Sequence, residues 1–319
     1  MTLLSETPVI NIGISSCLLG DKVRYDGGHK RNSYIEKTLG EYFQFIRFCP
    51  ELDIGLGVPR EPIHLVKDGE QIKCIGVKNP GKDVTEALRA SANKQMSWQS
   101  DICGYIFKKD SPSCGMERVK VYIKNQPNRI GAGVYAEQVM KNFPYLPVEE
   151  EGRLGDAVLR ENFIQRVYVL YRWKQMFKAD FSLHQLEKFH AQHKLIVMSH
   201  EQNAARELGR LVAEASKQTL QETTHVYLLK LMAALKLRAT RGNHVNVLQH
   251  IQGYLKCKLD SDDKAELSET IERYRIGEIP LIVPITLLHH HFRKCPDEYI
   301  ENSYYMRPYP AQMRLQNEI

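Results

Sequence analysis

The 319-residue chain lacks several features that would place it in a class at once. No apolar run approaches the roughly 20 residues that a membrane-spanning helix needs, so we expect no membrane partner. The start of the sequence has no basic stretch followed by an apolar one, and Glu6 adds to its difference from a signal peptide. No internal repeat or low-complexity tract is present. These absences predict a globular, cytoplasmic protein.

The cysteines are few and do not form the usual pairs. There are 7 of them, and none lies in a Cys-x-x-Cys pair, the commonest sequence signature of a structural zinc site. In a reducing compartment a disulfide framework is not expected. Metal binding, catalysis or burial must therefore account for these side chains.

A strong excess of charge is also missing. The net charge of +6 permits an RNA or phosphate partner without requiring one, because the basic excess of histone-like proteins is absent.

The first half of the chain has the pattern of an α/β domain. Short β-branched and aromatic runs predict strands at 9–14, 45–48 and 102–107, and helical spacing predicts helices over 33–43 and 83–96. Alternation of strands and helices indicates a Rossmann-like domain with a mostly parallel sheet.

A change of character near residue 150 divides the chain. Two prolines, three consecutive glutamates and two glycines predict a linker over 144–155. We therefore expect domains at 1–150 and 151–319, the second all-α. Its signals are a capping box at 182–185 and helical runs at 219–241, 260–276 and 279–294.

Three cysteines lie in turn-rich sequence after the predicted strands: Cys17, Cys49 and Cys114. Residues that follow parallel strands meet at one edge of the sheet, so these thiols can converge. Three thiolates would hold three irons of a cubane cluster and leave the fourth iron open, whereas electron-carrying clusters usually have four cysteine ligands. Zinc, or three unrelated buried cysteines, remain the alternatives at this point.

Two polar residues stand next to these cysteines. Glu51 follows Cys49 by two positions and is placed to exchange a proton near the same site, although an exposed loop or helix-capping glutamate is equally compatible with the sequence. Ser111 precedes Cys114 and is placed to donate a hydrogen bond to a substrate, although Ser-Pro is also ordinary turn chemistry.

Ordered motifs in the first part resemble the TudS-type thiouracil desulfurases, from about residue 10 to 135. They are CLLG (17–20) with RYDG (24–27), CPE (49–51), PREP (59–62), GKDVT (81–85) and SPSCG (111–115). The resemblance implies a 4Fe–4S cluster on Cys17, Cys49 and Cys114 with one open iron, and catalytic roles for Glu51 and Ser111. Four further polar residues are predicted to bind the substrate: Ser16, Arg24, Arg60 and Ser113.

The region from about 171 to 315 resembles the YbgA-type helical domain. Its motifs are FH (189–190), HK (193–194), LGRLVA (208–213), NVLQH (246–250), GYLK (253–256), YR (274–275) and PLIVP (280–284). The fusion of the two parts resembles the RudS proteins, which are linked to removal of sulfur from thiolated uridine in tRNA. The resemblance thus implies hydrolytic C=S cleavage in 4-thiouridine that yields uridine and hydrogen sulfide.

The helical half carries basic residues that suit RNA phosphates. We expect Lys194, Arg210, Lys236, Arg238 and Arg241 to contact RNA, although interleaved glutamates suit ordinary helix-face pairs equally well. Histidines also recur at helical spacing, for example at 289–291. No acidic or cysteine partner lies at zinc spacing beside them.

The leading hypothesis is therefore an iron–sulfur tRNA desulfidase. The alternatives are a desulfurase of small free thiobases or thionucleosides such as 2-thiouracil, and a non-catalytic cluster-bearing protein that binds RNA or senses redox state. The oligomeric state has no sequence signal.

Overall fold

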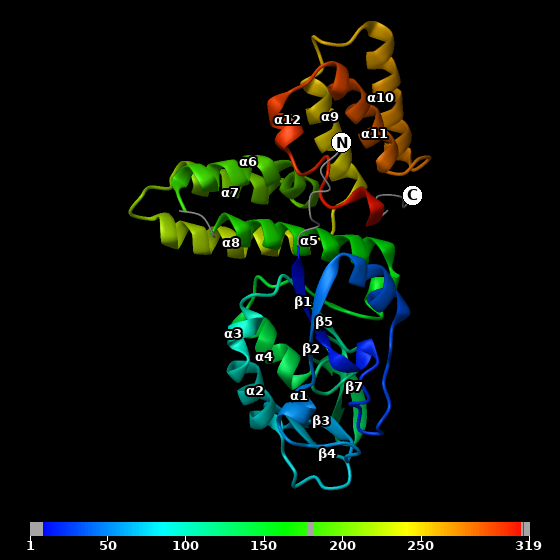
Figure 1. The fold of residues 1–319 in the computed structure, drawn as a ribbon, viewed down its shortest axis with the longest axis vertical. Coiled ribbons are helices and arrows are strands. Elements are labelled where there is room, and N and C mark those ends of the chain that lie inside the picture. The colour runs from blue at the N-terminus through cyan, green and yellow to red at the C-terminus, as the bar shows by residue number, and fades with distance from the viewer. Residues whose placement is uncertain (1–8, 178–180, 314, 316–319) are drawn as a thin grey trace. The chain divides into compact units, whose positions relative to one another are not determined.

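The computed structural model describes residues 9–177, 181–313 and 315. Residues 1–8, for which we predict no signal peptide, lie outside the described residues. The chain divides into two compact units, Met1–Gly155 and Asp156–Ile319 (Figure 1). The first unit is α/β and the second is helical, so the predicted fold class is confirmed. Among the described helices, none has the length and apolar character needed to span a bilayer.

A four-stranded parallel sheet forms the centre of the first unit. Its strands, in spatial order, are β2 (Phe43–Phe48), β1 (Ile10–Ser15), β5 (Tyr105–Phe107) and β8 (Val148–Glu150). The β-branched run of β1 is buried almost throughout, as expected for a strand that is covered on both faces. Figure 1 shows β1, β2 and β5 side by side, and their carboxyl ends lie at one edge of the sheet.

Strand β8 corrects the prediction of a linker over 144–155. The acidic sequence is buried because one partner four residues along and another 34 residues away satisfy it. Arg153 Nε donates to Glu149 Oε1 over 2.6 Å, and the backbone N–H of Met116 donates to Glu150 Oε1 over 2.8 Å. Burial raises the pKa of the Glu150 carboxyl. The composition alone resembled a linker because the pairing of β8 with β5 and the hydrogen bond from Met116 come from other parts of the chain.

A second sheet, which the sequence did not predict, packs in the same unit. Two antiparallel hairpins join through a parallel pairing of β3 with β6. The strand order is β4 (Gln71–Gly76), β3 (Ile63–Asp68), β6 (Val119–Ile123) and β7 (Gln126–Gly131).

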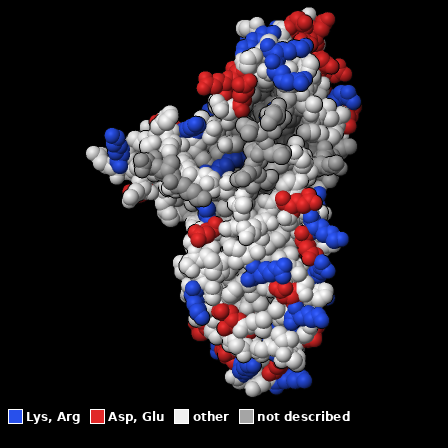
Figure 2. Space-filling model, viewed as in Figure 1, with Lys and Arg blue, Asp and Glu red and all other residues white. Residues whose placement is uncertain are grey.

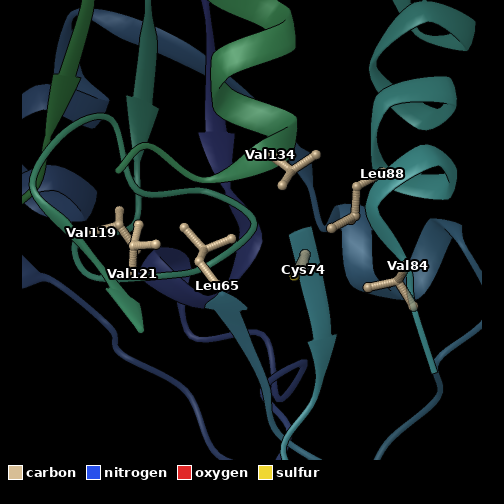
Figure 3. Packing of buried hydrophobic residues seen from close by; sticks show 7 residues of the cluster. All are labelled: Leu65, Cys74, Val84, Leu88, Val119, Val121 and Val134. Atoms are coloured by element: carbon tan, nitrogen blue, oxygen red, sulfur yellow. The ribbon is translucent and has the colours of Figure 1, made fainter. Parts of the chain in front are cut away.

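Helices α2 (Thr85–Lys94) and α4 (Val134–Asn142) cover part of this second sheet. Figure 3 shows Leu65 and Val121 of the sheet facing Leu88 of α2 and Val134 of α4. These side chains are almost completely buried, so they form a hydrophobic core between the second sheet and these two helices.

Two local predictions need correction in this unit. The helix expected over 33–43 is instead a π-turn, η2 (Tyr34–Thr38), followed by a 3₁₀ turn, η3 (Leu39–Glu41). Both Ile35 and Leu39 are buried, and only a few residues remain before β2 begins, so the chain turns rather than extending a regular helix. The helix expected over 83–96 ends at Lys94, and α3 (Met96–Gln99) follows it separately.

The second unit consists of helices. They are α5 (Ala157–Met176), α6 (Leu183–His200), α7 (Gln202–Ala213), α8 (Leu220–Lys236), α9 (Arg241–Gly253), α10 (Ser261–Ile276), α11 (Ile282–Lys294), α12 (Glu298–Asn302) and the 3₁₀ turn η5 (Ala311–Met313). The predicted capping box is confirmed, since Ser182 and Gln185 exchange both hydrogen bonds at the start of α6.

The helical run predicted over 219–241 is split in the structure. Helix α8 ends at Lys236, and Thr240 accepts from the Asn243 N–H to begin α9. Aromatic residues pack inside this unit, where Trp173 stacks on Tyr227 with ring centroids 5.5 Å apart. Trp173 therefore belongs to the core and offers no surface for base stacking.

Candidate active site

The three cysteines singled out from the sequence line one cavity of about 330 Å³. Cys17 lies in the 3₁₀ turn η1 (Ser16–Leu19) directly after β1, and Cys49 precedes the short helix α1 (Pro50–Asp53) directly after β2. Cys114 lies in the loop that follows β5. The parallel sheet thus brings together thiols that are up to 97 positions apart in sequence (114 − 17). None of the seven cysteines forms a disulfide.

Burial keeps these thiols neutral when nothing is bound to them. It raises the pKa of Cys17 to about 11, against the opposing effect of the Lys108 ammonium. Burial also raises the pKa of Cys49 and of Cys114, and a charge on Cys49 raises the pKa of both other thiols. Deprotonation of all three therefore requires a positive partner among the sulfurs, and a thiophilic metal centre supplies one.

The spread of the sulfur atoms indicates which kind of centre fits. Two sulfurs on one zinc ion can lie at most about 4.6 Å apart, because a Zn–S bond is about 2.3 Å long. The three sulfurs are not among the ligand sets of described residues that converge within 4.8 Å. The cavity is also about ten times the volume share of one water molecule. Three separated soft donors around a roomy cavity fit a multinuclear iron–sulfur cluster better than a single ion.

Glu51 enters the same cavity from the first turn of α1, where its side chain is held from one side by Arg60. Arg60 donates to Glu51 Oε2 through Nε over 2.9 Å and through Nη2 over 2.5 Å. Further bonds from Arg60 reach the carbonyl oxygens of Gly57 and Val23. The side chains of Arg60 and Glu51 are only 4% and 14% exposed, so Glu51 is not the solvent-exposed loop glutamate that the sequence also allowed.

The other carboxylate oxygen of Glu51 is bound by Ser113. Ser113 Oγ donates to Glu51 Oε1 over 2.5 Å and lies 3.0 Å from Ser111 Oγ. Because the single hydroxyl proton of Ser113 is directed at the carboxylate, Ser111 must donate in the bond between the two serines. Ser111 lines the cavity, so a hydrogen-bonded path leads from the cavity through both hydroxyls to Glu51.

Ser111 also stabilises its own loop. Its Oγ accepts from the backbone N–H of Cys114 over 3.1 Å, which is the turn role that the sequence offered as an alternative. The loop role and a place on the path to Glu51 are compatible, since a hydroxyl both donates and accepts.

The start of α4 holds the Cys114 loop in place. Val134 and Ala136 direct their backbone N–H groups at the carbonyl oxygens of Pro112 and Ser113. The first N–H groups of a helix have no partner inside the helix, so the loop carbonyls satisfy them. A Cβ on Gly133 would lie 2.5 Å from the carbonyl carbon of Ser113, and only glycine permits so close an approach.

The predicted substrate-binding residues do not share one position. Ser16, Arg24 and Arg60 line the cavity, and Arg60 is occupied by Glu51. Ser113 is completely buried and does not line the cavity.

The cavity also has basic residues that the sequence reasoning missed. They are Lys30, Lys108 and Lys109. Lys108 and Lys109 directly follow β5, so the rule that found the cysteines also points to them. Lys30 had no local signal. Lys108 pairs with Glu151, while Lys30 and Lys109 are exposed and form no ion pair with a described residue.

The predicted RNA-binding residues lie in the helical unit. Lys194 on α6, Arg210 on α7 and Lys236 at the end of α8 are exposed. Arg238 and Arg241 line a cavity of about 180 Å³ together with His200 and His244. Figure 2 shows Lys and Arg interspersed with Asp and Glu on the face in view, rather than a continuous basic surface there.

The remaining cysteines do not line the cavity. Cys74 and Cys103 are buried in the first unit, while Cys257 is exposed and Cys295 half-buried in the second.

Comparison with known proteins separates the chain into the same two parts. The family model described as 2-thiouracil desulfurase matches residues 12–151, and the model described as a protein of unknown function, DUF1722, matches residues 194–310. The chain is 28% identical over 153 residues to the uncharacterized protein YbgA of Escherichia coli (strain K12), covering 48% of this chain and 90% of that protein.

Two further similarities concern about a third and about half of the chain. The uncharacterized protein YbbK of Bacillus subtilis (strain 168) is 35% identical over 108 residues, which cover 32% of this chain and 71% of that protein. The solved structure of the 4Fe–4S-dependent thiouracil desulfidase TudS is 27% identical and has a TM-score of 0.37. That match covers 46% of this chain and 94% of that chain. The family-model match and the similarity to YbbK place the chain in the 2-thiouracil desulfurase family through residues 12–151, and residues 194–310 are similar to the DUF1722 family.

Proposed function

We propose that this protein removes sulfur from 4-thiouridine in tRNA, using a 4Fe–4S cluster held by Cys17, Cys49 and Cys114. The observation that carries the proposal is the convergence of these thiols and Glu51 on one cavity at the carboxyl edge of the parallel sheet. We assign the chemistry to residues 1–150 and RNA positioning to residues 151–319.

The reaction is a hydrolysis, in which C=S and water become C=O and hydrogen sulfide. The cluster, when bound, would supply a Lewis-acidic iron with affinity for sulfur. Glu51 accepts a proton from the water that adds to the thiocarbonyl carbon, and it returns that proton as the C–S bond breaks. Both protons of the released hydrogen sulfide thus come from water, and no oxidant or reductant is consumed.

The residues around Glu51 orient it for this task. Arg60 and Ser113 each hold one carboxylate oxygen, so the side chain has little freedom to rotate away. Ser111 lies at the cavity end of the hydroxyl path and is placed to donate to the substrate or to relay the proton.

The charge of the cavity supports a polyanionic substrate. Five basic residues line it, against the carboxylates of Glu51 and Asp110; the five are Arg24, Lys30, Arg60, Lys108 and Lys109. A free thiobase is uncharged and cannot form ion pairs with the two unpaired lysines, Lys30 and Lys109. The phosphates that flank a nucleotide in RNA can form such pairs. Arg238 and Arg241 would add phosphate contacts from the helical unit.

The test compares thiolated tRNA with free 4-thiouridine under anaerobic conditions after cluster reconstitution. We expect kcat/KM to favour tRNA strongly. The double variant Lys30→Gln/Lys109→Gln should raise KM for tRNA roughly tenfold and lower the slope of log KM against log salt by about 2. Its action on the free nucleoside should not change. Lys141→Gln is the matched control, an exposed lysine on α4 outside the cavity lining.

The outcomes separate the alternatives. Equal efficiency on the nucleoside, with no lysine effect on tRNA, would assign the protein to free thiobases or thionucleosides. An intact cluster with no loss of thiocarbonyl absorbance from any of these substrates would leave a non-catalytic cluster protein.

A further inference from the structure

His291 in the helical unit is a buried histidine without hydrogen bonds. It lies on α11 and is only 1% exposed, and neither ring nitrogen has a hydrogen-bond partner among the described residues. At least one of these nitrogens carries a proton in the neutral ring, so a donor and an acceptor are both left unsatisfied. A buried polar group without a partner costs about 1–3 kcal/mol and calls for an explanation.

Two carboxylates from the neighbouring helix lie beside this ring. Asp263 and Glu266 are three positions apart on α10, which places them on one face of that helix. Figure 1 shows α10 and α11 side by side, and the two helices pack against each other. One ligand atom from each of Asp263, Glu266 and His291 lies within 4.8 Å of the other two.

The group is not explained by ordinary side-chain pairing. No hydrogen bond or ion pair joins His291 to either carboxylate, and neither carboxylate accepts a hydrogen bond from another residue that the structure describes. The helix dipole favours an acid at Asp263 in the first turn of α10, but it accounts for neither Glu266 nor the unpaired ring.

The spacing suits a metal ion instead. Three ligand atoms bound about 2.1 Å from one ion lie about 3 to 3.6 Å from one another, so these atoms, which now lie within 4.8 Å, would complete the site by moving inward by the order of 1 Å. Glu266 is exposed, which leaves its side chain room for that movement.

We propose that Asp263, Glu266 and His291 bind a divalent transition-metal ion that joins α10 to α11. One imidazole with two carboxylates is a ligand set used by zinc, manganese and iron, and three protein ligands leave positions for water. This site lies in the helical unit and does not depend on the cluster or on the desulfuration proposed above.

The experiment measures zinc bound per chain after dialysis of the full-length, cluster-reconstituted protein against excess Zn²⁺. We expect the wild type to retain one more equivalent than Asp263→Asn/Glu266→Gln. Glu269→Gln is the control, because Glu269 is exposed one turn further along α10 and is not part of the group. It should bind as the wild type does.

His291→Leu is a second variant, which tests whether a loss of zinc in Asp263→Asn/Glu266→Gln is caused by misfolding. It places an apolar side chain of similar size where unpaired nitrogens are buried, so the protein should fold and still lose the zinc equivalent. In a Trp98→Phe background, unfolding of the helical unit can be followed at Trp173. Zn²⁺ should raise the midpoint temperature of that unfolding by roughly 5 °C in the otherwise wild-type protein and in Glu269→Gln, but not in the other two variants. Equal zinc content in all four proteins, with unfolding independent of Zn²⁺, would overturn the proposal and leave a water-filled polar cluster.

Discussion

At the scale of single residues, the site depends on how Glu51 is held. Each carboxylate oxygen has its own donor, Ser113 on one side and Arg60 on the other, and the ion pair is largely shielded from water. Removing one partner of a buried pair typically costs about 3–5 kcal/mol, because the remaining charge loses its counter-charge. Ser113 is therefore the better residue for testing orientation, since its loss leaves the ion pair intact.

Ser113→Ala should lower kcat roughly 10- to 100-fold, with iron content unchanged. The substitution removes the hydrogen bond to Glu51 Oε1 and interrupts the path from Ser111, but it leaves all three thiols in place. Turnover and iron per chain, measured on the same reconstituted samples, check the prediction. Ser97→Ala on α3 is the control, because Ser97 is exposed and lies outside the cavity lining. Unchanged kcat in Ser113→Ala would mean that Glu51 needs no second donor.

At the scale of elements, the Cys114 loop and the start of α4 form one piece. The helix donates its first N–H groups to the loop, and the backbone N–H of Gly133 donates to the carbonyl oxygen of Gly115 over 2.7 Å. Gly133 does not adopt a left-handed conformation, so glycine is needed here for close backbone approach rather than for its dihedral freedom. The Cys114 thiol is thereby positioned by a helix that follows it in sequence.

Gly133→Ala should displace Cys114 and reduce cluster loading. The added Cβ would meet backbone atoms of Ser113 and Cys114 at 2.5–2.7 Å, and backbone atoms have less room to yield than a side-chain end. We expect iron per chain to fall by at least about half and stability to fall by roughly 1–3 kcal/mol. Gly155→Ala is the matched control, since nothing lies within 4 Å of its Cβ position. Full iron loading in Gly133→Ala would show that the loop tolerates the shift.

At the scale of the whole molecule, the two units differ in their buried titratable groups. Burial lowers the pKa of His193 and His244 to about 3, and that of His190 and His200 to about 4. All four belong to the helical unit. The histidines of the first unit, His29 and His64, are not buried.

The helical unit should lose stability as the pH falls from about 6.5 towards 4. Over that window the unfolded chain binds protons that the folded histidines do not, so unfolding is favoured by up to about 1.4 kcal/mol per pH unit for each histidine. Well above a pH of about 6.5 these histidines bind no proton in the folded or the unfolded chain, so they no longer make the free energy of unfolding depend on pH.

Each unit contains one of the 2 tryptophans, so the effect can be assigned to a unit. Unfolding midpoints measured at Trp173 in Trp98→Phe should decrease with falling pH. Those measured at Trp98 in Trp173→Phe should change less. Parallel decreases at both tryptophans would contradict a histidine origin.

The sequence predicted the elements that carry the cysteines but not their full surroundings. Strands β1, β2 and β5 follow from local apolar runs, and the turn residues after them indicated the loops. The second sheet and β8 were missed because their pairing depends on partners far away in the chain. Glu150, for example, looks like a linker residue until the backbone N–H of Met116, 34 residues away, satisfies it.

The sequence by itself determined the fold class, the two-part organisation and the position of the three cysteines after strands, because each is encoded by local periodicity and turn chemistry. Only the tertiary structure decided that Ser113 rather than Ser111 touches Glu51, and that Lys30 enters the cavity. It also brought Asp263 and Glu266 to His291, although no acidic partner stands near that histidine in sequence. The physical reason is the same in each case: packing joins side chains from separate elements, and such contacts leave no local pattern along the chain.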